Sequence, residues 1–170
     1  MDSGALTVVA GMANLAGFYG EDVAAGGALF NAPRALALGR DGSLYVADTQ
    51  NGRVRRLAPD GAGAISSSSS VSTLASGLTA PAGLAIDTFG NLIFTSATTV
   101  DVVATGADGI PGKGDARLTI YGAPPRDSFP SSVTRCQSGV GVLQDSSTLL
   151  VADACLGYLV RLRRQDLPTP

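Results

Sequence analysis

The feature that most constrains the fold of this chain is an internal repeat. The stretch 33–61 and the stretch 81–109 fall in register without a gap. The aligned positions are turn residues and apolar strand residues: Pro33 with Pro81, Gly42 with Gly90, Leu44 with Leu92, Val54 with Val102, and Asp60-Gly61 with Asp108-Gly109. A third copy spans 139–162, with Val151-Ala152-Asp153 at the place of Val46-Ala47-Asp48. Repeats of this length indicate one supersecondary unit that is used several times.

Each copy predicts short strands separated by turns. In the first copy the strands lie around 35–38, 44–47, 53–57 and 71–74, and the second copy closes with a strand over 118–121. Asp41-Gly42 is typical of a hairpin turn, because glycine accepts the positive φ that such turns require. The serine run 66–70 indicates a flexible loop tip. Four antiparallel strands at this period are typical of a propeller blade, so we expect an all-β fold, a β-propeller of four-stranded blades.

Composition supports this fold and excludes several functions. The chain has 170 residues, 22 Gly and 9 Pro, but only one Glu (Glu21) and one Lys (Lys113), which argues against long surface helices. It has no His, which removes His-based catalytic triads and the usual zinc sites. The net charge is −2, which disfavours nucleic-acid binding. No apolar run reaches the ~20 residues of a membrane span.

Pro33, the turn Asp41-Gly42 and the stretch Tyr45-Val46-Ala47-Asp48-Thr49-Gln50-Asn51-Gly52-Arg53-Val54 resemble an NHL repeat. The later copies depart from this pattern. The second has Thr95-Ser96 in place of Ala47-Asp48, and the third has Ala154-Cys155-Leu156 in place of Thr49-Gln50-Asn51. The resemblance implies a β-propeller, commonly of six blades, that is used mostly as an interaction platform. It therefore implies another protein as the partner.

The expected organisation is a propeller segment over 1–164 and a tail over 165–170. The segment contains an N-terminal strand over 6–10 and repeats near 33–78, 81–121 and 139–164. This amounts to about three blade equivalents, fewer than the four of the smallest propellers. Three arrangements stay open: a partial propeller that belongs to a longer one, a homodimer that completes a six-blade ring, and an open arc. The open arc would expose two apolar blade faces.

Candidate binding residues fall in two groups. Asp48, Asn51 and Arg53 surround the turn after the second strand, and Asp153 repeats Asp48 in the third copy. They either face a partner or hydrogen-bond turn amides. The long segment 11–29 holds Phe18, Tyr19, Glu21 and Asp22, which either form a ligand lip or weak calcium site or belong to a packed loop.

Other features have simpler interpretations. Cys136 and Cys155 are a possible disulfide if the compartment, which composition leaves open, is oxidising. The clusters Arg53-Arg55-Arg56 and Arg161-Arg163-Arg164 fit solvated strand faces. The glycine-rich stretch 109–115 lacks the spacing of a phosphate loop and predicts a long turn between the third and fourth strands.

Together these observations predict a non-catalytic binding or scaffolding module whose propeller surface mediates protein–protein interaction. We expect no catalytic residue, metal or cofactor. The main alternative is part of a calcium-dependent propeller enzyme of the hydrolase or lyase type, and RNA binding is a weaker one because the chain is acidic.

Overall fold

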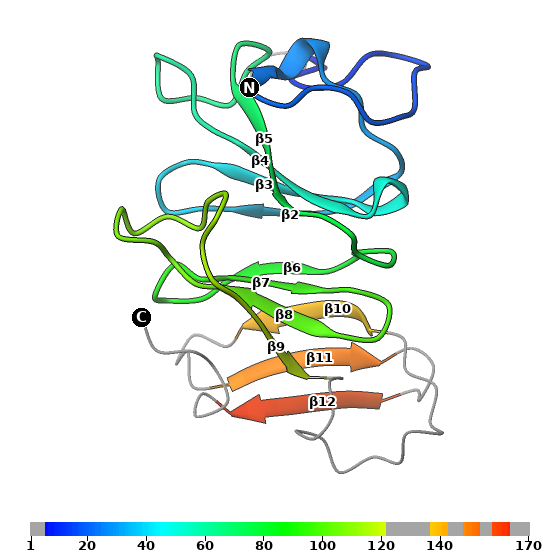
Figure 1. Ribbon diagram of the computed structural model, residues 1–170, viewed down its shortest axis with the longest axis vertical. Helices are drawn as coiled ribbons and strands as arrows, with labels where there is room; N and C mark the ends of the chain where they lie inside the picture. Colours follow the sequence, from blue (N-terminus) through cyan, green and yellow to red (C-terminus); the bar gives the residue numbers. More distant parts are fainter. Residues whose placement is uncertain (1–5, 122–136, 143–147, 154–157, 164–170) are drawn as a thin grey trace.

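Three antiparallel sheets stacked in chain order make up the computed structural model, which describes residues 6–121, 137–142, 148–153 and 158–163 (Figure 1). The first sheet contains β1 (Val23–Ala24), β2 (Pro33–Leu38), β3 (Leu44–Asp48), β4 (Arg53–Leu57) and β5 (Ser70–Ala75). The second contains β6 (Leu84–Ile86), β7 (Leu92–Thr95), β8 (Val100–Val103) and β9 (Arg117–Tyr121). The third contains β10 (Gln137–Val142), β11 (Thr148–Asp153) and β12 (Tyr158–Arg163). The described helices are two short 3₁₀ turns, η1 (Ala25–Gly27) and η2 (Thr49–Asn51).

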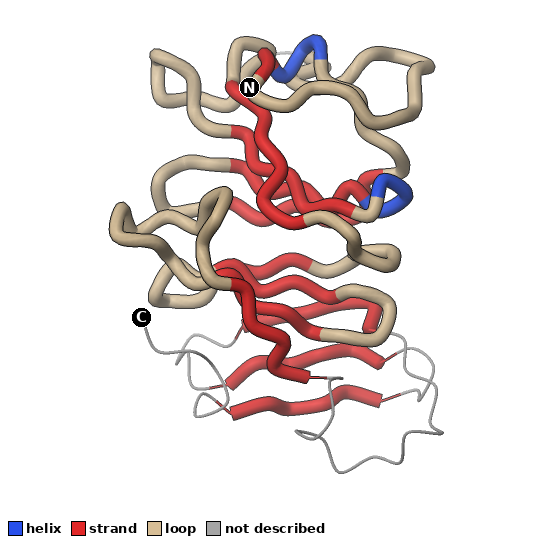
Figure 2. The backbone as a smooth tube through the Cα atoms, in the orientation of Figure 1, coloured by secondary structure: helices blue, strands red, loops and turns tan. Residues whose placement is uncertain are grey.

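The strand order within the sheets is that of propeller blades. It is β1-β5-β4-β3-β2 in the first sheet, β6-β7-β8-β9 in the second and β10-β11-β12 in the third. The first strands of the repeats adjoin one another, since β6 contacts both β2 and β10. The three sheets therefore follow one another face to face, as the tube view shows (Figure 2). The all-β prediction with about three blades is confirmed, and we call the sheets blades 1, 2 and 3.

Successive side chains of a strand point to opposite faces of its sheet, and apolar residues on both faces explain why the sheets stack. In β3, Tyr45 and Ala47 point to blade 2, whereas Leu44 and Val46 point to the opposite face. Both faces of the blade are thus apolar, because neighbouring residues of a strand point to opposite sides. The hairpin turn predicted at Asp41-Gly42 is present, with Gly42 at φ +82°.

Apolar clusters between successive blades form the core. Between blades 1 and 2, the cluster contains Tyr45, Ala47, Val54, Ala75, Leu84, Leu92, Phe94 and Val103. Between blades 2 and 3, it contains Ile93, Val100, Val102, Ile120, Leu149 and Val151. A third cluster lies on the other face of blade 1, where Ala25 and Ala28 of the N-terminal segment cover Val46, Leu57 and Val71.

The prediction of a strand over 6–10 is wrong. Residues 6–10 contain no strand, and the added strand of blade 1 is instead β1, which pairs Val23 with Val71 and Ala24 with Ser70. In this chain β1 already pairs with the outer edge of β5, so that edge of blade 1 is taken and residues 6–10 do not pair there.

The serine run 66–70, predicted as a loop tip, makes specific contacts with the N-terminal segment. Ser69 is fully buried, and the backbone carbonyls of Ser67 and Ser69 accept hydrogen bonds from Gly26 and Ala25 at 3.0 and 2.8 Å. The run thus holds η1 against blade 1. Its partners lie far upstream in the chain, so no local pattern could indicate these bonds.

Of the remaining predictions, the structure confirms the long turn over 109–115 and does not test the cysteine pair. The stretch 109–115 lies in the connection between β8 and β9, as predicted, and leads into a strand. Cys136 and Cys155 lie outside the described residues. Within the described part of the chain, no helix has the length and apolar character needed to cross a membrane.

Candidate binding surface

The N-terminal segment 10–30 lies over the outer part of blade 1 and carries half of the predicted binding residues. Besides β1, its backbone forms bridges between Ala16 and Phe30 and between Tyr19 and Leu29. Gly11 donates a hydrogen bond to the carbonyl of Ala25 at 3.0 Å. These bonds fold the segment back on itself, so a stretch of chain with little regular structure has a defined path.

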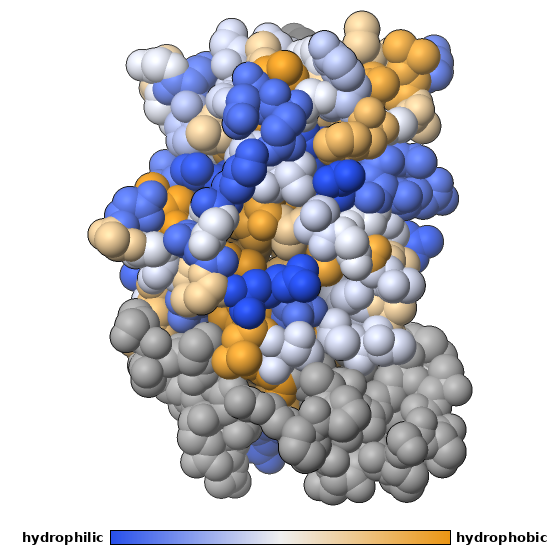
Figure 3. Space-filling model, viewed as in Figure 1, coloured by the Kyte–Doolittle hydropathy of each residue, from blue (hydrophilic) through white to orange (hydrophobic). Residues whose placement is uncertain are grey.

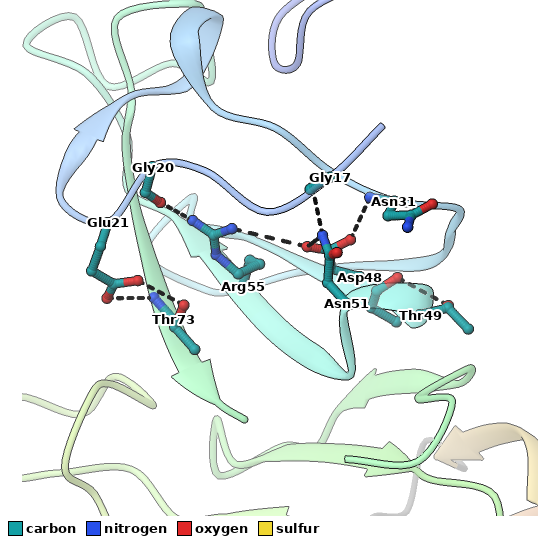
Figure 4. Close-up of polar contacts among 10 residues, drawn as sticks. Gly17, Gly20, Glu21, Asn31, Asp48, Thr49, Asn51, Arg55 and Thr73 are labelled. Carbon is teal, nitrogen blue, oxygen red and sulfur yellow. Dashed lines mark hydrogen bonds and ion pairs between the residues drawn. The ribbon is translucent and has the colours of Figure 1, made fainter. Parts of the chain in front are cut away.

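Asp48 is the buried centre of a polar network that ties this segment to blade 1 (Figure 4). Its carboxylate accepts hydrogen bonds from the backbone N–H of Asn31 at 2.7 Å and from the Asn51 amide at 2.8 Å. The same Asn51 nitrogen donates to the carbonyl of Gly17 at 2.7 Å. The turn η2 holds Asn51 close to Asp48, and Gly52 ends this turn at φ +61°. Asn51 therefore binds a backbone group within the segment, and Asp48 binds the backbone of Asn31 directly after it.

The prediction of a solvated strand face is wrong for Arg55, whose side chain is fully buried beneath the segment. Arg55 donates a hydrogen bond to the carbonyl of Gly20 and lies 3.9 Å from the Asp48 carboxylate. Burial lowers the pKa of the Arg55 guanidinium, and the carboxylates of Glu21 and Asp48 act against this shift. The repeat held a signal for this burial, because the aligned residue in blade 2 is Val103, which is buried.

Glu21 joins three parts of the chain. Its carboxylate accepts hydrogen bonds from the N–H and the hydroxyl of Thr73 at 2.9 and 2.7 Å, and from Lys113 at 3.4 Å. Burial opposes ionisation of this carboxyl, but the bonds from Thr73 and Lys113 outweigh it and lower the pKa of Glu21. The contact with Lys113 connects the segment to the long connection between β8 and β9 of blade 2.

Phe18 and Tyr19 are large and exposed, and Phe18 is held beside a cation. The guanidinium carbon of Arg53 lies 3.9 Å from the centre of the Phe18 ring, within the range of a cation–π contact. Phe18 is 44 % exposed and Tyr19 60 % exposed. Asp22, at φ +57°, is also exposed. We call the group Phe18, Tyr19, Glu21, Asp22 and Arg53 the rim patch.

The structure thus brings most predicted site residues together. Asp48 and Asn51 lie beneath the segment, and the rim patch lies on and beside it. Asp153 ends β11 in blade 3, as Asp48 ends β3 in blade 1, but its side chain lies outside the description. Asn31, Arg55, Thr73 and Lys113 also take part, although sequence reasoning assigned them no role there. In the described residues, no three acidic, cysteine or histidine side chains converge as a metal site would require.

The chain matches no protein-family model and no curated protein. It is similar to solved structures that have the same architecture. A chain in the crystal structure of the nidogen/laminin complex is 20 % identical with a TM-score of 0.56, and the match covers 80 % of this chain and 46 % of that one. A gluconolactonase from Xanthomonas campestris is 22 % identical with a TM-score of 0.54, covering 80 % of this chain and 39 % of that one.

A third structure, described as a putative gluconolactonase, is 20 % identical with a TM-score of 0.52, and the match covers 77 % of this chain and 44 % of that chain. The present chain therefore spans less than half the length of each of these three. At such identities the likeness concerns the fold alone. Together with the strand order and the apolar layers between sheets, it shows that this chain has the fold of a partial β-propeller of about three blades.

Proposed function

We propose that this chain is a non-catalytic protein-binding segment of an NHL-type propeller and that it binds its partner through the rim patch. The observation that carries the proposal is the position of Phe18 and Tyr19. Two adjacent aromatic side chains stay exposed on a segment that the Asp48 network holds to a rigid sheet. Aromatic residues and arginine are enriched among the residues that dominate binding energy at protein interfaces.

Preorganisation of the patch supports the same function. Binding costs less when the contact residues are already held in place. Arg53 is stacked on Phe18, and Glu21 is fixed by Thr73, so these side chains lose little freedom when a partner docks. The exposed carboxylate of Asp22 would favour a partner with a basic group next to an apolar pocket that accepts Tyr19.

The assignment to NHL repeats is supported because the residues that resemble the NHL pattern coincide with strands of blade 1. The residues that resemble the NHL pattern form β2 to β4 with η2 in the intervening turn. Blade 2 keeps the strands but has Ser96 at the place of Asp48, so the Asp–Asn pair of the pattern belongs to blade 1. There it holds the segment that carries the rim patch.

The experiment is photo-crosslinking from a benzoyl-phenylalanine placed at position 19, followed by a binding assay with the captured protein. Tyr19→Ser should weaken binding about 30-fold or more, because a central aromatic contact is worth roughly 2 kcal/mol or more. Leu118→Ser on β9 is the control, because Leu118 is an exposed apolar residue outside the patch. The proposal fails if no discrete crosslink forms at position 19, or if both variants bind equally.

Two further measurements test the alternatives. A calcium-dependent rise in melting temperature, compared with a chelator, would favour the hydrolase or lyase type, because a ligand that binds the native state stabilises it. Retention on RNA that falls steeply with salt would favour nucleic-acid binding. We expect neither effect.

A further inference from the structure

A polar pocket of about 350 Å³ lies at the outer edge of blade 1. Its lining combines residues 73–76 in and after β5, Glu21 of the N-terminal segment, Arg53 at the start of β4 and Lys113 from the connection between β8 and β9. In the space-filling view, hydrophilic surface is prominent over the region of β5, whereas apolar surface appears at the upper end of the molecule (Figure 3). The pocket therefore differs in chemistry from the apolar layers between the blades. We call it the Arg53 pocket.

Arg53 lines this pocket without an acceptor oxygen of its own. Within the described residues, its Nε atom is buried without a hydrogen-bond partner, and no ion pair includes its guanidinium. The next arginines of β4 differ, because Arg55 donates to the Gly20 carbonyl and Arg56 lies 3.0 Å from the Asp41 carboxylate. A buried donor without an acceptor costs free energy. An oxygen supplied by a ligand in the pocket would remove that cost.

The same repeat position is satisfied internally in blade 2. Arg53 aligns with Asp101, which is 3 % exposed. The carboxylate of Asp101 accepts hydrogen bonds from the hydroxyls of Thr99 and Thr119 at 2.8 and 2.6 Å. The repeat thus places a charged group at this position in both blades, but only in blade 2 does the described chain provide its partners. For Arg53 the partners would have to come from a ligand.

The side chains around the pocket are already held in place. The ring of Phe18 lies 3.9 Å from the guanidinium carbon of Arg53, and this contact restricts the side chain without offering it an acceptor oxygen. Thr73 is held by its two hydrogen bonds to Glu21 (Figure 4). A ligand therefore loses little binding free energy to the ordering of these groups.

The charges of the pocket favour a singly charged anion. Arg53 and Lys113 are positive and Glu21 is negative, so one positive charge is in excess. Glu21 does not neutralise Arg53, because one carboxylate oxygen binds Lys113 and the Thr73 N–H and the other binds the Thr73 hydroxyl. A guanidinium binds a carboxylate through two parallel hydrogen bonds. A phosphate group carries about two negative charges and would be repelled by Glu21.

We infer that the Arg53 pocket binds a carboxylate group. The origin of this group rests on the proposed function: Arg53 belongs to the rim patch, so the carboxylate is one that the docked partner presents beside Phe18. The exposed hydroxyl of Ser76 is a further donor at the pocket. The partner thus carries an acidic group that is matched to Arg53.

The first test is a titration of the full ¹⁵N-labelled chain with sodium acetate at constant ionic strength, followed by NMR at the Arg53 Nε–H and the Ser76 amide. Acetate should shift both signals in a saturable way. Acetamide, a neutral molecule of the same shape, should not. The absence of a saturable acetate shift would overturn the inference. Phosphate that saturates the signals at a lower concentration than acetate would overturn the assignment to a carboxylate.

Four variants test the role of each charge, with the Ser76 amide as the signal. Arg53→Gln should abolish acetate binding, and Arg53→Lys should weaken it about tenfold because the two-pronged donor is lost. Glu21→Gln should strengthen it about threefold, because a like charge is removed from the pocket. Arg34→Gln is the matched control: it makes the same charge change at an exposed arginine of β2 and should bind acetate as the wild type does. Unchanged binding by Arg53→Gln would refute the site.

A second assay separates this inference from the proposed function. With the protein captured by the crosslinker at position 19, Arg53→Gln should weaken binding about tenfold or more, whereas Arg34→Gln should not. A captured partner that is indifferent to Arg53→Gln would support the rim patch but overturn the partner as the source of the carboxylate. Acetate binding without any crosslink at position 19 would refute the protein-binding function and assign the pocket to a free small carboxylate.

Discussion

The buried pair Asp48 and Arg55 offers a sharp test of how blade 1 is stabilised, because blade 2 carries a natural replacement for it. In the register of the repeats, Asp48 aligns with Ser96 and Arg55 with Val103. The substitutions Asp48→Ser and Arg55→Val, alone and together, therefore copy one blade of this protein into another. Blade 2 shows that the sheet itself does not need the ion pair.

The single substitutions should be costly for different reasons. Asp48→Ser leaves the guanidinium of Arg55 fully buried without its counter-charge, which should cost about 4 kcal/mol of unfolding free energy. Within the described structure, the Nε and Nη1 atoms of Arg55 have no hydrogen-bond partner, so the bond to the Gly20 carbonyl and the more distant carboxylate of Glu21 compensate the charge only in part. Arg55→Val should cost about 2 kcal/mol, because Asp48 keeps its bonds from Asn31 and Asn51.

The double variant removes both charges, and we expect it to cost about 3 kcal/mol, less than the sum of the single costs. The coupling is then about 3 kcal/mol. In a chain of 170 residues, 1 kcal/mol shifts the melting temperature by roughly 2–4 °C. Asp48→Ser should therefore melt about 12 °C lower than the wild type.

The assay is urea unfolding followed by circular dichroism and tyrosine fluorescence, since the chain has no tryptophan. The control cycle uses Arg56→Ala and Asp41→Ala, a pair at 3.0 Å whose side chains are partly exposed, and its coupling should stay below about 1 kcal/mol. If the two costs at Asp48 and Arg55 simply add, the buried pair is not a coupled unit and the reasoning is refuted.

Three other perturbations follow from the same contacts. The pKa of Glu21 is lowered in the fold, so its contribution to the unfolding free energy is present above pH 4.5 and is lost as the pH falls. Glu21→Gln should therefore lower the unfolding free energy by less than about 1 kcal/mol at pH 7. The same variant should show a smaller decline of the melting temperature between roughly pH 5 and pH 3. Burial raises the pKa of Tyr45 from 10.0 to about 12, so the unfolded chain ionises first and stability falls between these values. In a pH series, Tyr45→Phe should remove up to about 3 kcal/mol of this alkaline loss of unfolding free energy. At pH 7 the same variant should lower the unfolding free energy by about 1 kcal/mol, because the hydrogen bond to the Pro111 carbonyl is lost. Gly52→Ala should lower the unfolding free energy by about 2 kcal/mol in urea, because its φ is +61° and a Cβ would lie 2.5 Å from the Leu78 carbonyl oxygen; equal stability would contradict this.

Much of the sheet structure could be predicted because it depends on local alternation and turns. The predicted strand over 44–47 forms part of β3, and the one over 53–57 coincides with β4. Apolar residues in a period of two and glycine at a positive φ are properties of neighbouring residues. The repeat then carries the same reasoning from blade 1 to blade 2 without further assumptions.

The position of Arg55 could not be predicted from its own strand. Three arginines in Arg53 to Leu57 fit a solvated face, and only the N-terminal segment, whose Gly20 lies 35 residues upstream, turns that face into an interior. The same holds for Leu6 to Ala10, which have the residues of a strand, whereas β1 takes the outer edge of blade 1. Burial of a charge and pairing of a strand both depend on distant chain, so local pattern does not indicate them.

The amino-acid sequence alone predicts the all-β class, the blade as the repeating unit, the approximate positions of β2 to β5 and β9, and the count of about three blades, because these depend on short-range periodicity. Which residues face a neighbouring blade depends on how the distant parts of the chain pack. The tertiary structure placed Leu84 under blade 1 and left Leu36 open, although both are leucines at the same repeat position. The reason is that the burial of a side chain is a property of what lies against it.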